Sequence, residues 1–225
     1  MKTIIKVIVL FITTVCLAQD PIEKTIGEFS ELKVYDLIEV ELIKSDKDAI
    51  VIEGKNADDV VVISKNGTLK IKMKIEEAFD GSNTKVKLYY TNIDVIDVNE
   101  GAQVHSKDTI KQFEIDLNGQ EGGKINLNVD VNYLNVKSVT GADIVASGIA
   151  KKQDITIYTG GDYDGKLLKT EVTEVSINAA GEAYVNASKK VIAKVKAGGD
   201  IFIYGNPEQI DESKILGGRI KKMDD

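Results

Sequence analysis

Apolar and polar residues alternate along most of the chain, with the period of two that is typical of strands buried on one face. The alternation is clear over residues 32–42, 69–73 and 86–88. Asn66-Gly67 separates two such runs and predicts a two-residue hairpin, because both turn positions tolerate a positive φ. No long segment has a helical period, and residues 75–79 predict at most one helical turn. The pattern therefore indicates an all-β protein.

Glycine recurs at a nearly constant spacing in the second half of the chain. Each of these glycines lies between two alternating runs, so a unit of about 20 residues contains short strands separated by corners. Such a unit cannot close a core alone, and neighbouring units must stack. Glycine suits a corner that needs a positive φ or a close backbone approach. The glycines are Gly101, Gly122, Gly141, Gly161, Gly181 and Gly199.

These patterns predict a right-handed β-solenoid, or β-helix. We expect coils of about 20 residues with about three short strands each, and less regular N-terminal strands capping one end. A leucine-rich repeat is disfavoured, because the L-x-x-L-x-L spacing is missing and the runs prefer Val and Ile. A β-sandwich stays open as an alternative, since it also has strands at regular spacing.

The first residues have the three parts of a secretory signal peptide. Lys2 and Lys6 precede the apolar run 7–16, and small residues follow it. The run is shorter than the roughly 20 residues that span a bilayer. A lipidated Cys16 is the alternative, but the residues before it match that motif poorly. We predict a signal peptide at 1–18, a linker at 19–26, the solenoid domain at 27–207 and a C-terminal cap or tail at 208–225.

Composition excludes several classes of function. The chain has 29 basic and 36 acidic residues, a net charge of −7, which argues against a nucleic-acid partner. Its one Cys lies in the predicted signal peptide. Its one His, His105, is too few for a His-rich zinc site, and it is the only histidine that could act as the base of a nucleophilic triad. No glycine-rich loop opens a helix, so no cofactor is expected. No later segment is apolar enough to cross a membrane.

Acidic residues near the corners form one candidate site. They are predicted to stack into a column, which leaves open weak calcium binding or the paired carboxylates of a glycosidase. The simpler interpretation, which we favour, is that Asp follows Gly at exposed corners because its short side chain bonds nearby backbone. We assign no catalytic residue and no metal site. The column consists of Asp143, Asp162, Asp164 and Asp200.

Aromatic residues near the same corners form a second candidate site. Tyrosine offers sugars an apolar face with a polar tip, so aligned rings on neighbouring coils predict an exposed binding ladder. Packing in the core is the simpler alternative. The residues are Tyr158, Tyr163, Tyr184 and Tyr204, with Phe202 between the last two.

The order of these features resembles the putative auto-transporter adhesin, head GIN domain family. The resemblance covers about residues 27–207, and it rests on the runs 29–34, 38–42 and 66–71, the glycine repeats and Tyr204-Gly205-Asn206-Pro207. It implies a β-helix-like fold in the envelope of a Bacteroidetes-type bacterium. It brings no defined catalytic residues.

Together these observations predict a non-enzymatic, exported protein of the periplasm, cell surface or extracellular space. It would act as an adhesin-like binding or structural module, with a glycan or an envelope protein as its partner. The alternative is a polysaccharide lyase or hydrolase that uses acidic residues on the solenoid face. A cleft with two carboxylates about 5–10 Å apart would favour the enzyme.

Overall fold

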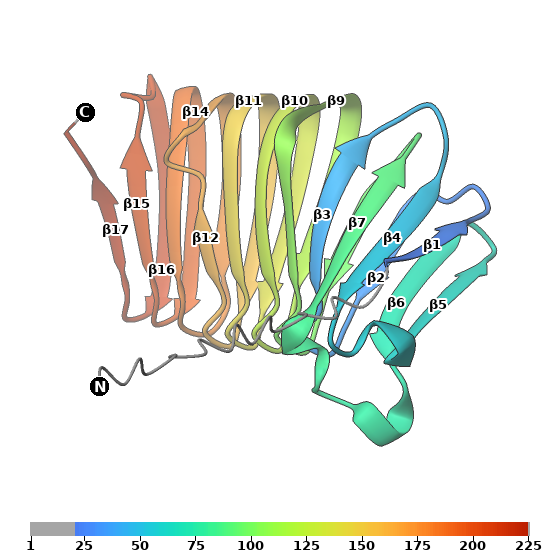
Figure 1. Cartoon of the computed structure of the whole chain (residues 1–225). Helices are drawn as coiled ribbons and strands as arrows, with labels where there is room; N and C mark the ends of the chain where they lie inside the picture. Colours follow the sequence, from blue (N-terminus) through green and yellow to red (C-terminus); the bar gives the residue numbers. More distant parts are fainter. Residues whose placement is uncertain (1–20, 225) are drawn as a thin grey trace, which may run out of the picture.

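The computed structural model describes residues 21–224, and most of them lie in strands (Figure 1). The predicted all-β solenoid fold is confirmed. The strands are β1 (Ile22–Thr25), β2 (Glu31–Val34), β3 (Glu39–Lys44), β4 (Ala49–Gly54), β5 (Val60–Lys65), β6 (Thr68–Met73), β7 (Thr84–Tyr90), β8 (Val95–Val98), β9 (Gln103–Gly119), β10 (Lys124–Val139), β11 (Asp143–Tyr158), β12 (Asp162–Asp164), β13 (Leu168–Ile177), β14 (Glu182–Ala197), β15 (Asp200–Tyr204), β16 (Gln209–Leu216) and β17 (Arg219–Lys222), with 3-10 turns η1 (Ala57–Asp59), η2 (Ile75–Glu77) and η3 (Gly81–Asn83).

Each long strand bends once and serves two sheets. In β10, residues 124–131 pair with the first half of β11 and residues 133–139 with its second half. Paired positions lie about 19 residues apart along the chain. A coil therefore has two strand segments, where the glycine spacing alone predicted about three. The difference arises because the two segments are longer than expected: residues 124–131 and 133–139 of β10, with a single-residue bend between them, leave room in the repeat only for the glycine corner.

We name the two sheets after β3 and β2. The β3 sheet runs β1, β4, β7, β3, the first halves of β9, β10 and β11, β12 with the start of β13, the first half of β14, β15 and β17. The β2 sheet runs β5, β6, β2, β8, the second halves of β9, β10, β11, β13 and β14, and β16.

The core lies between the two sheets and consists of columns of aligned apolar residues. In one column of the β2 sheet every side chain from β9 to β14 is at most 3% exposed. Each buried aliphatic side chain of this kind contributes about 1.5–3 kcal/mol. In-register stacking thus turns the alternation of every strand into one continuous core. The column is Leu117, Val136, Ile155, Val175 and Ala193.

The glycine corners use both properties predicted for them. At one corner Glu121 and Gly122 have φ values of 53° and 75°, and the N–H of Gly123 donates to the carbonyl of Gln120. Such a left-handed pair closes a tight turn, as in a type I′ turn. Gly161 serves the other purpose, because a Cβ there would lie 2.6 Å from the backbone carbonyl of Ser138.

The N-terminal strands end the parallel stack on one side, as predicted. The β5–β6 hairpin closes at Asn66-Gly67, where φ is 53° and 78°, which confirms the expected turn. On the other sheet β1 runs antiparallel to β4. Residues 22–25 therefore form an edge strand inside the segment that we expected to be a linker, because Ile22 packs against the core.

The structure describes the C-terminal segment but not the N-terminal one. The predicted signal peptide, residues 1–18, lies outside the described residues. Between residues 21 and 224, no helix has the length and apolar character to cross a membrane. The segment predicted as a cap or tail contributes β16, which pairs with β14, and β17, which pairs with β15. It thus adds one more coil to the stack.

One buried hydroxyl gives a stability prediction with a defined sign. Within residues 21–224, Thr84 Oγ1 is the buried side-chain polar atom that has no hydrogen-bond partner. Thr84→Val should raise the free energy of unfolding by about 1 kcal/mol, because it removes an unsatisfied group at constant shape.

Thr173→Val is the matched control. Thr173 Oγ1 accepts from Gln153 Nε2 at 2.8 Å, so the same change there should cost about 1–3 kcal/mol. Urea unfolding measures the change in the free energy of unfolding for both variants. Two changes of the same sign would contradict the prediction.

Candidate binding face

The predicted acidic column forms in part. Parallel register places Asp143, Asp162 and Asp200 in one outward column of the β3 sheet. Glu182 stands between the last two and was missed, although it follows a repeat glycine as the aspartates do. Asp164 lies outside the column, two residues along β12 and level with Tyr184.

The contacts of this column are structural. Asp162 Oδ1 accepts the backbone N–H of Glu182, on the next coil, at 2.8 Å. Arg219 Nε donates to Asp200 at 2.9 Å and holds the pKa of that carboxyl below its usual value. In the described part of the chain, no group of three or more His, Cys, Asp or Glu side chains is placed to hold a metal ion.

Tyr163 does not belong to an exposed aromatic surface. It is fully buried, on the inward side of β12 and in register with Ile144 and Ala183. Its hydroxyl donates to Gln153 Oε1 at 2.7 Å, and Gln153 continues the chain of bonds to Thr173. Burial raises the pKa of Tyr163 far above its ordinary value. Tyr163 is thus a core residue whose polar tip is satisfied inside the solenoid.

The other predicted aromatic residues do not offer a flat platform. Tyr184 and Phe202 stack on each other, with ring centroids 4.8 Å apart and an interplanar angle of 17°. Each ring therefore covers one face of the other. Tyr204 is 8% exposed and lies beneath the Lys166 ammonium. Tyr158, at 39% exposure, borders a hollow on the opposite sheet.

Five hollows lie on the outer face of the β2 sheet, which we call the binding face. Their volumes run from about 250 to 570 Å³. All are open to solvent and follow one another across neighbouring strands from β5 to β11. They are lined by mixed polar and apolar side chains, of which the most relevant are Tyr35, Lys65 and Lys70 at one end and Asp116, Asn135 and Asp154 in the middle.

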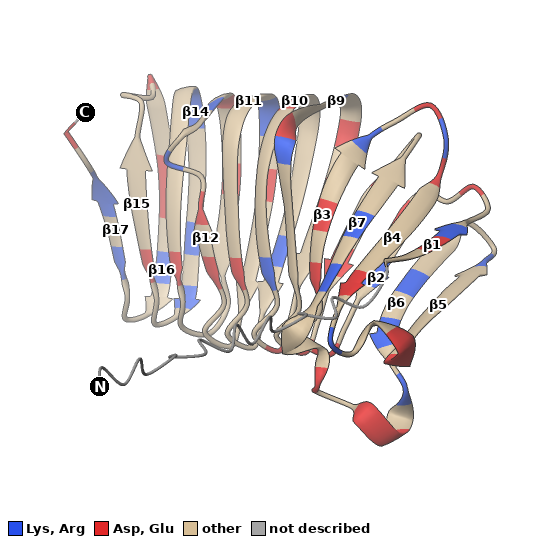
Figure 2. Ribbon diagram, in the orientation of Figure 1, with Lys and Arg blue, Asp and Glu red and all other residues tan. Residues whose placement is uncertain are grey.

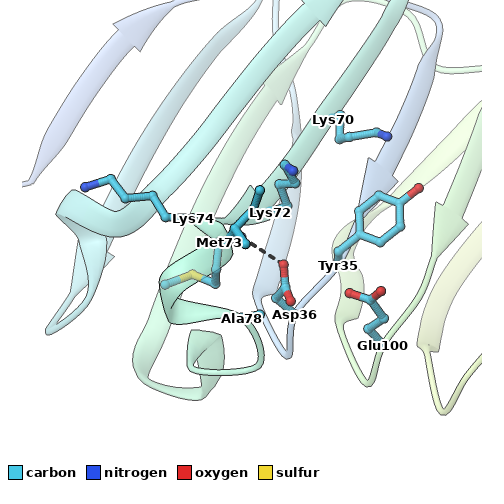
Figure 3. Close-up of a pocket in the computed structure, with 9 residues that line it drawn as sticks. Tyr35, Asp36, Lys70, Lys72, Met73, Lys74, Ala78 and Glu100 are labelled. Atoms are coloured by element: carbon cyan, nitrogen blue, oxygen red, sulfur yellow. Dashed lines mark hydrogen bonds between the residues drawn. The ribbon is translucent and has the colours of Figure 1, made fainter.

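Two adjoining hollows at the N-terminal end are rich in lysine. The inner hollow, about 280 Å³, includes Lys70, Lys72 and Lys74 (Figure 3), and basic residues are visible along β6 in Figure 2. The outer hollow, about 460 Å³, is lined by Lys33, Tyr35, Ile63, Lys65, Asn66, Thr68 and Lys70. Tyr35 and Lys70 line both hollows, and the Lys70 ammonium lies 5.1 Å from the centre of the Tyr35 ring.

Asp36 supports the inner hollow from within. Asp36 is 6% exposed, and its carboxylate accepts the backbone N–H of Met73 at 3.0 Å (Figure 3) and that of Phe79 at 3.1 Å. Glu100 lies beside it, and burial together with Asp36 and Glu121 raises the pKa of the Glu100 carboxyl. The inner hollow therefore combines lysines with acidic groups, whereas no carboxylate lines the outer one.

The middle of the binding face carries two carboxylates on alternate coils. Asp116 and Asp154 flank Asn135, so two strand spacings, about 9–10 Å, separate their backbones. Asn135 Nδ2 donates to Asp116 Oδ1 at 2.7 Å. Burial, and secondarily the charge of Glu174, raises the pKa of Asp154.

An exposed aromatic pair was missed by the sequence reasoning. Phe113 is 64% and Tyr133 43% exposed, with ring centroids 5.3 Å apart. Phe113 borders a hollow of about 570 Å³, and Tyr133 points outward in register with Glu114. Alternation with Ile115 suggests a buried Phe113, but the nearby bend turns its ring outward. Their separation of one repeat is the signal that could have found them.

The fold is a β-solenoid of two mainly parallel sheets, and the five hollows described above lie on the outside of the β2 sheet. This chain belongs to the family described as putative auto-transporter adhesin, head GIN domain, whose model matches residues 28–207. The predicted membership is thereby confirmed. A comparison with curated proteins finds no match.

Solved structures share the fold at low sequence identity. A protein from Bacteroides fragilis named as a putative adhesin superposes with a TM-score of 0.84 at 20% identity, over 91% of this chain and 96% of that one. A protein from Parabacteroides distasonis named as a putative lipid binding protein gives 0.72 at 19% identity over the same shares. A putative adhesin from Parabacteroides merdae gives 0.73 at 16%. These likenesses show the fold.

Proposed function

We propose that this protein is an exported, non-enzymatic, adhesin-like module of the bacterial cell envelope that lays an extended glycan along its binding face. The observation that carries the proposal is the arrangement of five hollows on one sheet face. A rigid stack of coils repeats its surface at each strand spacing, so it can contact successive units of one polymer. Exposed aromatic rings on this face add surfaces for sugar rings.

The aromatic pair gives a matched test of the binding face. Phe113→Ala with Tyr133→Ala should weaken binding to a glycan identified on a glycan array by about tenfold or more, since two sugar-contacting rings are lost. Tyr184→Ala with Phe202→Ala removes an aromatic pair from the β3 sheet and should leave affinity unchanged. Isothermal titration of both variants makes the comparison. Equal losses, or an array with no bound glycan, would argue against the proposal.

The middle of the face supports a second candidate function, glycoside hydrolysis. Inverting hydrolases place a protonated acid and an ionised base about 6.5–9.5 Å apart. Asp154 is the candidate acid, because burial raises the pKa of its carboxyl, and Asp116, two strand spacings away, is the candidate base. Release of reducing ends from the bound glycan, abolished by Asp154→Asn, would establish this activity. Binding without any release would leave the non-enzymatic module.

A further inference from the structure

We propose that the outer hollow is a subsite for the acidic sugar units of a polysaccharide, with carboxylate or sulfate groups held by Lys65 and Lys70. This inference rests on the proposed function and specifies the chemistry of its ligand. The hollow is about 460 Å³ and lies at the tip of the β5–β6 hairpin. It is the part of the binding face where positive charge gathers without a lining carboxylate.

The charges of the hollow are available to a ligand. Among residues 21–224, no carboxylate lies within ion-pair distance of Lys65 or Lys70. Lys33 is different, because Glu31 at 2.9 Å and Asp97 at 3.1 Å already neutralise it. Clustered, unpaired lysines on a protein of net charge −7 attract anions locally, while the rest of the surface repels them.

The remaining lining suits a sugar ring better than a bare anion. Asn66 offers an amide to sugar hydroxyl groups, and the Thr68 hydroxyl, which donates to Glu31, offers its oxygen as an acceptor. Ile63, which is 42% exposed, and the ring of Tyr35 offer apolar surface on the same side of the sheet as Lys70. The Lys70 ammonium is oriented by its position over that ring. Charge, hydrogen-bonding groups and apolar surface thus meet in one hollow.

Binding of defined polymers to the intact protein tests the proposal. Polygalacturonate, dextran sulfate, neutral dextran and polyphosphate of similar length are titrated at low and high salt. We expect one or both acidic polysaccharides to bind, with affinity that falls as salt rises. Which of the two binds better identifies the anionic group as carboxylate or sulfate. Lys65→Gln with Lys70→Gln should weaken that binding about tenfold, whereas Lys169→Gln with Lys221→Gln, which removes equal charge from the β3 sheet, should not.

The other outcomes separate this inference from the proposed function. If neutral dextran binds as well as the acidic polymers, or if the lysine variant binds normally, the outer hollow is not an acidic-sugar subsite, although the glycan-binding module stands. Equal binding of polyphosphate would overturn the requirement for a sugar. If no polysaccharide binds at any salt concentration, both the subsite and the module are overturned. Circular dichroism of each variant shows that the fold is intact.

Discussion

Asp36→Ala is expected to lower the free energy of unfolding by about 3–5 kcal/mol, a large part of the total for most domains. The change leaves the buried N–H of Met73 and the part-buried N–H of Phe79 without their acceptor, and a buried donor left unpaired costs about 1–3 kcal/mol. Alanine is also strained where Asp36 has a φ of 60°, a conformation that Asp and Asn tolerate better. Urea unfolding followed by circular dichroism measures the loss.

Asp36→Asn provides the control for this prediction. Asparagine accepts the left-handed backbone and keeps one carbonyl oxygen as an acceptor, so it should lose about half as much stability as alanine. In both variants, amide hydrogen exchange should accelerate at Met73 and Phe79 before the rest of the solenoid opens. An alanine variant as stable as the native protein would show that Asp36 does not hold this region together.

Glu212→Val with Lys214→Val is expected to drive association of the chains end to end. In register, Glu212 and Lys214 continue the buried columns of Ala193 and Val195, so they occupy inward positions of the last coil. Inward charges on an exposed edge oppose pairing with another sheet, because stacking would bury them. Two valines would replace this barrier with the apolar surface that every earlier coil uses to stack.

Sedimentation velocity measures this effect as a shift to larger species that grows with concentration. Asp211→Val with Ser213→Val is the matched control, because it adds two valines on the outward side of β16, and it should associate less. Deleting residues 207–225 should act in the same direction as the inward valines, since it bares Val191, Ala193 and Val195. If the inward variant sediments like the native chain, the charges are not what limits the stack.

The solenoid could be predicted because individual residues at fixed positions mark each repeat. Glycine corners and alternating strands give the register almost directly, as at Gly122, and Asn66-Gly67 marks its hairpin without any tertiary information. It was harder to predict which side chains of a short strand face the core. Tyr163 belongs to a strand of three residues, in which the sequence alone does not decide which side faces the core.

The candidate site was much less predictable than the fold. The hollows depend on which side chains meet across strands that are distant in sequence, as Tyr35 meets Lys70 and Asp116 meets Asn135. Periodicity places such residues on an outer face, but it does not tell which of the two outer faces carries a binding site. The acidic and aromatic residues at the corners were predicted as candidate sites because they follow glycines. Most of the hollows, however, lie on strands away from those corners.

The position of β2 has a consequence for the order of folding. Leu32 pairs with Leu69 on one side and with Ile96 on the other, 37 and 64 residues later in the chain. The coil nearest the N-terminus is thus enclosed by coils that emerge after it. In contrast, β10 and β11 pair across only 19 residues, for example Lys124 with Asp143. Short loops close fastest, so structure should form first in the regular C-terminal coils and spread toward the N-terminal end, opposite to the direction in which the chain is synthesised.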